Sequence, residues 1–150
     1  MTEQVINVRK GFAAGALRDI ESRRQQLTAL RAMVSDHAAD FAAALGDDLG
    51  RSELLAHVTE TGFVLNEIDD ALGHLDVWTR PQKVRLPLKL GPGKAVRVPE
   101  PLGTVLIIAP WNYPIQLTLA PQVAALAAGN TVVLKPSEHA PATSAALARF

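Results

Sequence analysis

The sequence predicts an α/β protein: an N-terminal helical layer, a β-hairpin arm, and then the start of a parallel, Rossmann-like sheet that the 150 residues leave incomplete. Two apolar runs, residues 103–109 and 131–134, carry this prediction, because they are rich in β-branched residues and end abruptly at polar groups. Such continuous runs are typical of strands buried on both faces of a parallel sheet. Residues 115–128 between them have the length of a helix and end at Gly129-Asn130, a favourable left-handed cap. The three segments form a βαβ unit, whose crossover is expected to be right-handed.

The polar residues that follow the two predicted strands are the candidates for function. In open parallel sheets, ligands bind beyond the carboxyl ends of the strands. Asn112 and Lys135 come one to three residues after the predicted strand ends, so we expect both on the same rim of the sheet. The amide of Asn112 suits a donor to a developing oxyanion. The alternative is that Asn112 caps a helix that starts near Pro114.

Each neighbouring candidate also has a structural alternative. Lys135 is either a solvated lysine or a donor to ribose hydroxyls or a phosphate. Glu138 either accepts from a ribose hydroxyl or stabilises the first turn of a helix that begins near Pro141. Trp111 and Tyr113 bury large apolar areas, so packing is weighed against ligand recognition for both.

Residues 1–80 predict a layer of amphipathic helices that covers the sheet. Their N-terminal caps are expected at Thr2, Asp19, Ser35 and Ser52. Their ends are expected near Gly15, Gly50 and Pro81. The charge pairs Arg23-Arg24 and Asp69-Asp70 are interpreted as solvated faces, and nothing in this layer specifies chemistry.

Residues 82–100 predict the hairpin arm, and residues 102–150 the βαβ unit with the start of the next helix. Residues 84–90 alternate between apolar and polar side chains, which indicates a strand with one apolar face. Pro87 restricts that strand to an edge or a projecting arm. A turn then leads to a second strand over residues 94–98. The Gly-Pro-Gly-Lys turn is not a phosphate loop, because it lacks the first glycine and the Ser/Thr of that motif.

Composition excludes several classes of function. The 15 basic and 15 acidic residues cancel, which argues against a nucleic-acid or anionic-membrane partner. No apolar stretch reaches the roughly 18 residues of a membrane helix, and the acidic start does not match a signal peptide, so the predicted location is cytoplasmic. The absence of cysteine excludes disulfides and thiolate metal sites. His37, His57 and His74 lack metal-ligand spacing, so no metal site is expected.

Three blocks of the sequence resemble the aldehyde dehydrogenase superfamily, in order and at appropriate spacing: Pro101-Leu-Gly-Thr-Val, Ala109-Pro-Trp-Asn-Tyr-Pro and Ala127-Ala-Gly-Asn-Thr-Val-Val-Leu-Lys-Pro-Ser-Glu. The short helical start and the hairpin are similar to the class 3-type branch. The resemblance implies oxidation of an aldehyde to a carboxylic acid with NAD or NADP, through a covalent thioester. It also implies a homodimer in the full-length protein, with the arm used in subunit assembly.

The resemblance also implies a role for each residue of the rim. Asn112 matches the catalytic asparagine whose amide stabilises the tetrahedral oxygen. Lys135 and Glu138 match the pair that holds the adenine ribose, and the charge of Glu138 favours NAD. Tyr113 matches a residue near the substrate tunnel. The remaining cofactor-binding positions are Ile108, Ala109, Pro110, Trp111 and, in the loop beneath the cofactor, Ser137.

The sequence departs from the superfamily in one respect. The cysteine nucleophile and the glutamate base are expected well beyond Phe150, and the chain stops within an apparent helix. We therefore expect the N-terminal part of the NAD(P)-binding domain, without the catalytic domain and inactive alone. The alternatives are a non-catalytic nucleotide-binding module, an assembly fragment, or part of a CoA-acylating or glutamyl-phosphate-type reductase.

Overall fold

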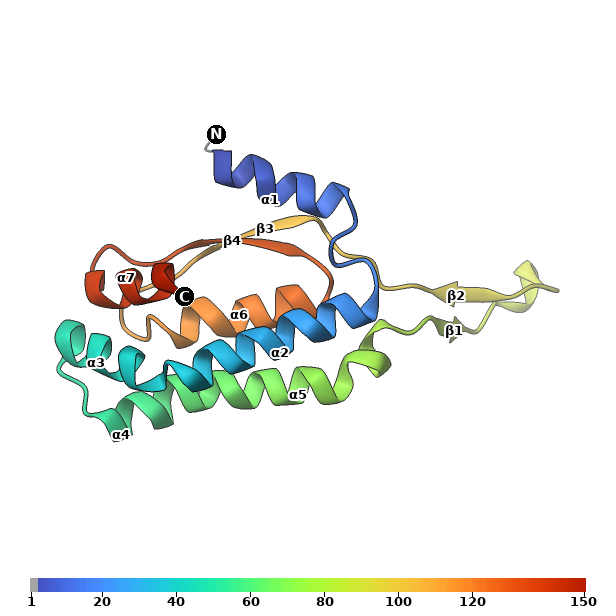
Figure 1. Cartoon of the computed structure of the whole chain (residues 1–150). Helices are drawn as coiled ribbons and strands as arrows, with labels where there is room; N and C mark the ends of the chain where they lie inside the picture. Colours follow the sequence, from blue (N-terminus) through green and yellow to red (C-terminus); the bar gives the residue numbers. More distant parts are fainter. Residues whose placement is uncertain (1–2) are drawn as a thin grey trace.

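The structure is a computed structural model that describes residues 3–150 (Figure 1); the predicted cap at Thr2 lies outside them. The helical layer comprises α1 (Glu3–Ala13), α2 (Ile20–Asp36), α3 (Ala38–Leu49), α4 (Glu53–Ala56), the π-helix η1 (His57–Thr61) and α5 (Gly62–Thr79). The arm comprises β1 (Gln82–Val84), the 3-10 turn η2 (Leu88–Leu90) and β2 (Ala95–Arg97). The βαβ unit comprises β3 (Thr104–Ile108), α6 (Gln116–Ala127) and β4 (Thr131–Lys135), and α7 (Pro141–Arg149) follows it.

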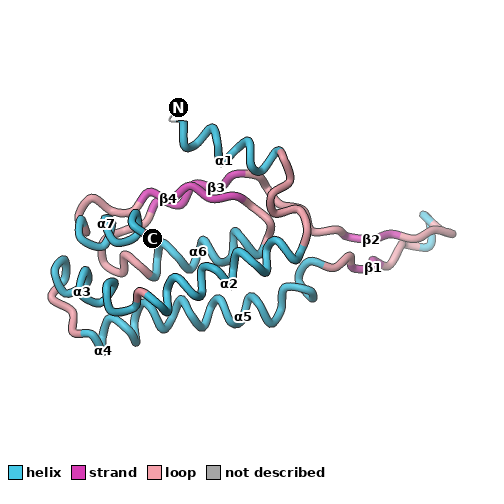
Figure 2. The backbone as a smooth tube through the Cα atoms, viewed as in Figure 1, coloured by secondary structure: helices cyan, strands magenta, loops and turns pink. Residues whose placement is uncertain are grey.

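Strands β3 and β4 confirm the predicted parallel sheet. Their register pairs Thr104 with Thr131 at one end and Ile108 with Lys135 at the other. Helix α6 covers one face of this sheet and α1 lies over the other, while α2 and α5 pack against α6 from below (Figure 2). The fold is therefore the α/β arrangement that the sequence predicts, with a helical layer on a short parallel sheet.

The hydrophobic core lies mainly between α2, α3, α5 and α6. Its fully buried members are spaced by four or seven residues along each helix, as in an amphipathic helix. They include Leu27, Val34, Phe41, Leu45, Val64, Ile68, Leu75, Ile115 and Leu119. No helix within residues 3–150 is long and apolar enough to cross a membrane.

The structure confirms most of the helix caps that the sequence predicts from neighbouring residues. Asp19 accepts a hydrogen bond from the Ser22 N–H at 2.8 Å, and Ser52 accepts one from the Leu55 N–H at 3.3 Å. Gly50 ends α3 in the left-handed conformation, with φ of 65°. The predicted cap at Ser35 was wrong, because α2 continues to Asp36 and α3 begins directly after His37.

The solvated interpretation of Arg23 was also wrong. Its side chain is buried, with 8% of the residue exposed. Its guanidinium donates to three backbone carbonyls: Leu17 at 2.8 Å, Arg18 at 3.2 Å and Ala127 at 3.3 Å. Gly129 ends α6 with φ of 88°, and a Cβ there would lie 2.5 Å from this guanidinium. Arg23 therefore ties the start of α2 to the end of α6.

The two strands of the arm are shorter than the sequence predicts, and more of the arm is irregular. Strands β1 and β2 pair antiparallel, with Val84 opposite Ala95, but the predicted strand over 84–90 ends at Val84. Pro87 has no N–H to donate to a ladder, and Leu88–Leu90 form a 3-10 turn instead. The arm projects from the body of the molecule (Figure 1), and Leu88 at its tip is 98% exposed.

Candidate active-site rim

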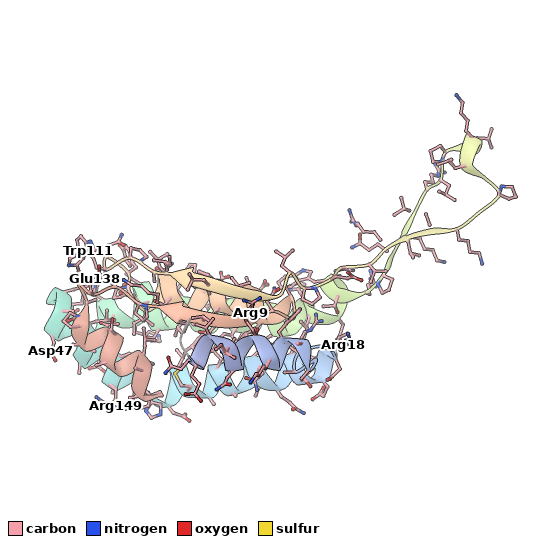
Figure 3. The ribbon with its side chains drawn as sticks, turned by 90° about the horizontal axis from the view of Figure 1, so that it is seen from above. Arg9, Arg18, Asp47, Trp111, Glu138 and Arg149 are labelled. Atoms are coloured by element: carbon pink, nitrogen blue, oxygen red, sulfur yellow. The ribbon has the colours of Figure 1, made fainter. Side chains whose placement is uncertain are left out.

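The two loops that follow β3 and β4 lie at the same edge of the sheet. Beyond the last register pair, the Ala109 N–H donates to the Lys135 carbonyl at 3.1 Å. Figure 3 shows Trp111 from one loop and Glu138 from the other at the same end of the molecule, opposite the arm. The topology on which the site prediction depends is therefore present: parallel strands whose carboxyl ends carry the candidate residues.

The β3–α6 loop, residues 109–115, presents most of its candidates to solvent. Ile108 at the strand end and Pro110, Trp111 and Asn112 in the loop are exposed, whereas Ala109 is buried. Within residues 3–150, nothing forms a hydrogen bond with the side-chain amide of Asn112. This amide is therefore free to donate to a ligand.

Asn112 does not cap α6, so the capping alternative was wrong. The helix begins at Gln116, four residues later. Its first N–H groups are bound by Glu60 from η1: one carboxyl oxygen, Oε2, accepts from Ile115 N at 2.7 Å and from Gln116 N at 3.1 Å. Glu60 is 0% exposed. Burial raises the pKa of this carboxyl, and the two N–H groups and the nearby Arg51 oppose that effect.

Arg51 joins Glu60 to the loop. Its Nη1 donates to the other carboxyl oxygen of Glu60, and its Nη2 donates to the backbone carbonyl of Asn112. Its guanidinium carbon lies 4.5 Å from the centre of the Tyr113 ring, a cation–π contact. Sequence reasoning missed both Arg51 and Glu60. Neither belongs to a motif, and Glu60 lies 55 positions from its first partner.

The β4–α7 loop, residues 136–140, is held mainly by local contacts. Lys135 and Glu138 form an exposed ion pair, and the hydrogen bond from Lys135 lowers the pKa of Glu138. Ser137 is buried; its Oγ accepts from His139 N at 3.2 Å, and its carbonyl accepts from Ser144 Oγ at 2.9 Å.

Helix α7 also has a remote cap that sequence reasoning missed. The carboxylate of Asp48 accepts from Ala142 N at 3.0 Å and from Thr143 N at 2.7 Å. Glu138 faces Lys135 instead, so its predicted alternative as a first-turn acid of this helix is not what the structure shows.

Two hollows bear on ligand binding. A pocket of about 370 Å³ lies beside the β4–α7 loop, and its lining includes Lys135, Pro136, Ser137, Glu138, Ser144 and Leu147. A larger groove of about 890 Å³ lies between α1 and the sheet, lined by Val5, Phe12, Leu102, Leu106 and Val133 among others. The larger groove contains none of the candidate residues, whereas the smaller pocket contains three of them.

Comparison with known proteins identifies the class to which this fold and rim belong. The model of the aldehyde dehydrogenase family matches residues 2–150, so the chain belongs to that family. It is 44% identical over 146 residues to aldehyde dehydrogenase family 3 member H1 of Arabidopsis thaliana, covering 97% of this chain and 30% of the relative. The class 3-type resemblance is therefore confirmed. The chain spans about 30% of the length of the relatives it matches.

Solved structures agree with the fold. The substrate-bound state of Staphylococcus aureus AldH superposes with a TM-score of 0.95 at 39% identity, covering 98% of this chain and 32% of that one. The NADP complex of the glyceraldehyde-3-phosphate dehydrogenase GapN from Methanocaldococcus jannaschii gives a TM-score of 0.75 at 22% identity, covering 98% and 33%. The second likeness shows the fold alone.

Proposed function

We propose that this chain is the N-terminal part of the nucleotide-binding domain of an enzyme that oxidises an aldehyde to a carboxylic acid with NAD or NADP. One observation carries the proposal: the parallel register places Ile108 beside Lys135, which brings the Asn112 loop and the Lys135–Glu138 loop to one edge. Membership of the aldehyde dehydrogenase family supports an aldehyde-oxidising oxidoreductase. The cysteine nucleophile of a thioester mechanism would come from residues outside this chain, which has no cysteine, so the chain alone would be inactive.

Lys135 and Glu138 would hold the adenine ribose of the cofactor. An ammonium donates to hydroxyls and a carboxylate accepts from them, and the two groups already face each other beside the 370 Å³ pocket. The related fold of GapN is described in complex with NADP. The charge of Glu138 repels a 2′-phosphate, which favours NAD. The bound cofactor would accept the hydride. The exposed residues Ile108, Pro110 and Trp111 would run along the cofactor. Ala109 would lie buried behind these residues, and Ser137 would lie in the loop beneath the cofactor.

Asn112 would stabilise the developing oxyanion with its side-chain amide. Its backbone carbonyl is bound by Arg51, while its amide has no partner among residues 3–150. An amide that is held by its main chain and free at its tip suits this role, because oxyanion stabilisation depends on donors positioned in advance. Tyr113, whose ring lies against Arg51, would border the substrate.

The exposed arm supports a further part of the proposal, that the complete protein is a homodimer joined through it. A cytoplasmic location remains a prediction from the sequence. Leu88, Leu90 and Val96 expose between 60% and 98% of their surface, which is apolar area that a partner subunit would cover.

The test is kinetic and uses the complete protein that contains this chain. Asn112→Ala should lower kcat for aldehyde oxidation by about 10²-fold or more, while the Kd for NAD measured by calorimetry stays within about twofold. Lys135→Ala should do the reverse, raising the Kd for NAD with a much smaller effect on kcat at saturation. Unchanged turnover in Asn112→Ala would refute the oxyanion role, and equal loss of turnover and cofactor affinity would indicate a structural one.

A further inference from the structure

A buried ion pair lies beside the Asn112 loop, and only its bond to the Asn112 carbonyl enters the proposed oxyanion role. Glu60 is fully buried and the Arg51 side chain is only 13% exposed. Both come from the helical layer, Arg51 from the turn before α4 and Glu60 from the π-helix η1. Burying two charges is costly unless their geometry and hydrogen bonds compensate, so their placement here requires an explanation.

We propose that Arg51 and Glu60 are positioning residues for Asn112, fixing the backbone of the β3–α6 loop so that the free amide is held in one place. This inference rests on the proposed oxyanion role of Asn112. It assigns the pair no contact with the substrate or the cofactor.

The contacts attach the loop at two points. In the middle of the loop, Arg51 binds the Asn112 carbonyl and lies against the Tyr113 ring. At the far end, Glu60 binds the N–H groups of Ile115 and Gln116. The ion pair between Arg51 and Glu60 closes the connection. Because the amide itself has no partner within residues 3–150, its position depends on the backbone that this pair holds.

Capping of α6 alone does not explain Arg51. Asp48 also binds two N–H groups at the start of α7, one with each carboxyl oxygen, and it has no ion-pair partner among the described residues. A carboxylate is therefore sufficient to cap a helix in this fold. The arginine at the other junction adds the bond to the Asn112 carbonyl, which has no counterpart at α7.

The π-helix explains how Glu60 reaches the loop. A π-helix has a wider turn than an α-helix and commonly occurs at functional sites. Here Gly62 N donates to the His57 carbonyl five residues earlier, and Glu60 and Thr61 both face the core. A Cβ at Gly62 would lie 2.8 Å from that carbonyl. Glycine therefore permits the turn that directs Glu60 toward α6.

The experiment is a double-mutant cycle in the complete protein, with Arg51→Lys and Asn112→Ala. Arg51→Lys keeps the charge beside Glu60 but replaces the planar guanidinium with a single ammonium nitrogen, which cannot reproduce the two separate bonds that Nη1 and Nη2 make to Glu60 and to the Asn112 carbonyl. We expect kcat to fall by about 10- to 100-fold, the size expected for a displaced catalytic group. The KM and the Kd for NAD should change by less than about threefold. In the Asn112→Ala background the same change should have little further effect on kcat, because the group that Arg51 positions is gone.

Two further variants separate positioning from general destabilisation. Glu60→Gln keeps an oxygen for the two N–H groups but loses the charge that holds Arg51, so we expect it to lower kcat as Arg51→Lys does. Asp19→Ala removes the cap of α2, far from the loop, and should lower stability with no change in kcat.

If Asn112→Ala lowers turnover but Arg51→Lys and Glu60→Gln do not, the positioning role is refuted and the proposed function stands. Losses in kcat that add fully in the double mutant would also refute it. If Asn112→Ala itself has no effect, the proposed function fails first.

Discussion

The two strand-to-helix junctions of this fold are built differently, although both lie at the same edge of the sheet. Each helix receives a carboxylate from the helical layer, Glu60 for α6 and Asp48 for α7. Glu60 is fully buried and paired with Arg51, whereas Asp48 is half-buried and has no such partner among the described residues. The junction that carries the candidate catalytic amide is therefore fixed by remote charged residues. The junction that carries the candidate ribose-binding pair has a remote carboxylate on its helix, but its loop residues are held mainly by bonds among themselves.

The difference matches the two proposed tasks. A group that stabilises a transition state must be held in position before the reaction, because reorganisation during the reaction costs rate. A lysine and a glutamate that bind a ribose act as flexible, exposed groups and tolerate more freedom. The buried pair is thus expected to matter for turnover, and the local bonds of the second loop for cofactor affinity.

The largest effect should come from Glu60→Ala. It leaves Arg51 without its partner in a buried site and the Ile115 and Gln116 N–H groups unbound. Breaking a buried ion pair in this way costs about 3–5 kcal/mol. Chemical denaturation of the complete protein should show a loss of this size in the free energy of unfolding. A loss below about 1 kcal/mol would mean that water replaces the carboxylate and that the junction is not built as described.

Gly62→Ala should come next. Its methyl group would lie 2.8 Å from the His57 carbonyl, and backbone that must move to accept an added carbon typically costs about 1–3 kcal/mol. Gly73→Ala in the same helix is the matched control, since a Cβ there meets nothing within 4 Å. The two variants are compared by thermal denaturation. Equal melting temperatures would contradict the tight π-turn.

Asp48→Ala tests the second junction with a smaller expected effect. Loss of a helix cap costs about 0.5–2 kcal/mol, and no buried counter-charge is left behind. The free energy of unfolding should therefore fall by less than in Glu60→Ala, with kcat unchanged. If the two substitutions cost the same, the distinction between the junctions is wrong.

The smallest effect on stability is expected at the exposed ion pair of Arg31 and Asp69, which contrasts with the buried pair of Arg51 and Glu60. Arg31 Nε donates to the Asp69 carboxylate at 2.6 Å and lowers its pKa. Because the native pKa lies below the unfolded value of about 3.9, the stabilisation is fully present above that value and is lost as pH falls through the native pKa. Asp69→Asn should therefore melt slightly earlier than the wild type at pH 7, with the gap closing in acid and in high salt. If the difference in melting temperature between the two proteins widened in acid, the Arg31–Asp69 pair would not stabilise the fold in the way described.

The sequence predicted those parts of the fold that depend on neighbouring residues. The βαβ unit followed from two apolar runs, and the caps at Asp19 and Ser52 from side chains three residues from their partners. Asn112 and Lys135 were placed on one rim by topology alone. Two local predictions were wrong: the helix cap at Ser35, where α2 continues to Asp36, and the strand over residues 84–90, where Pro87 cannot donate to a ladder.

The remainder was not predictable because the partners are far apart in sequence. Glu60 lies 55 positions from Ile115, Asp48 lies 94 from Ala142, and Arg23 lies 104 from Ala127. All three are charged residues on helices whose usual position is the solvated face. Only the packing of the helical layer against the βαβ unit shows that they bind backbone groups there.

A crystal structure of the complete protein with NAD bound is the most direct test of the proposed site. We predict that the nucleotide lies across the carboxyl ends of β3 and β4, with Lys135 Nζ within hydrogen-bond distance of a ribose hydroxyl and Asn112 still bound to Arg51 through its carbonyl. A nucleotide bound instead in the groove between α1 and the sheet, or Asn112 released from Arg51, would contradict it.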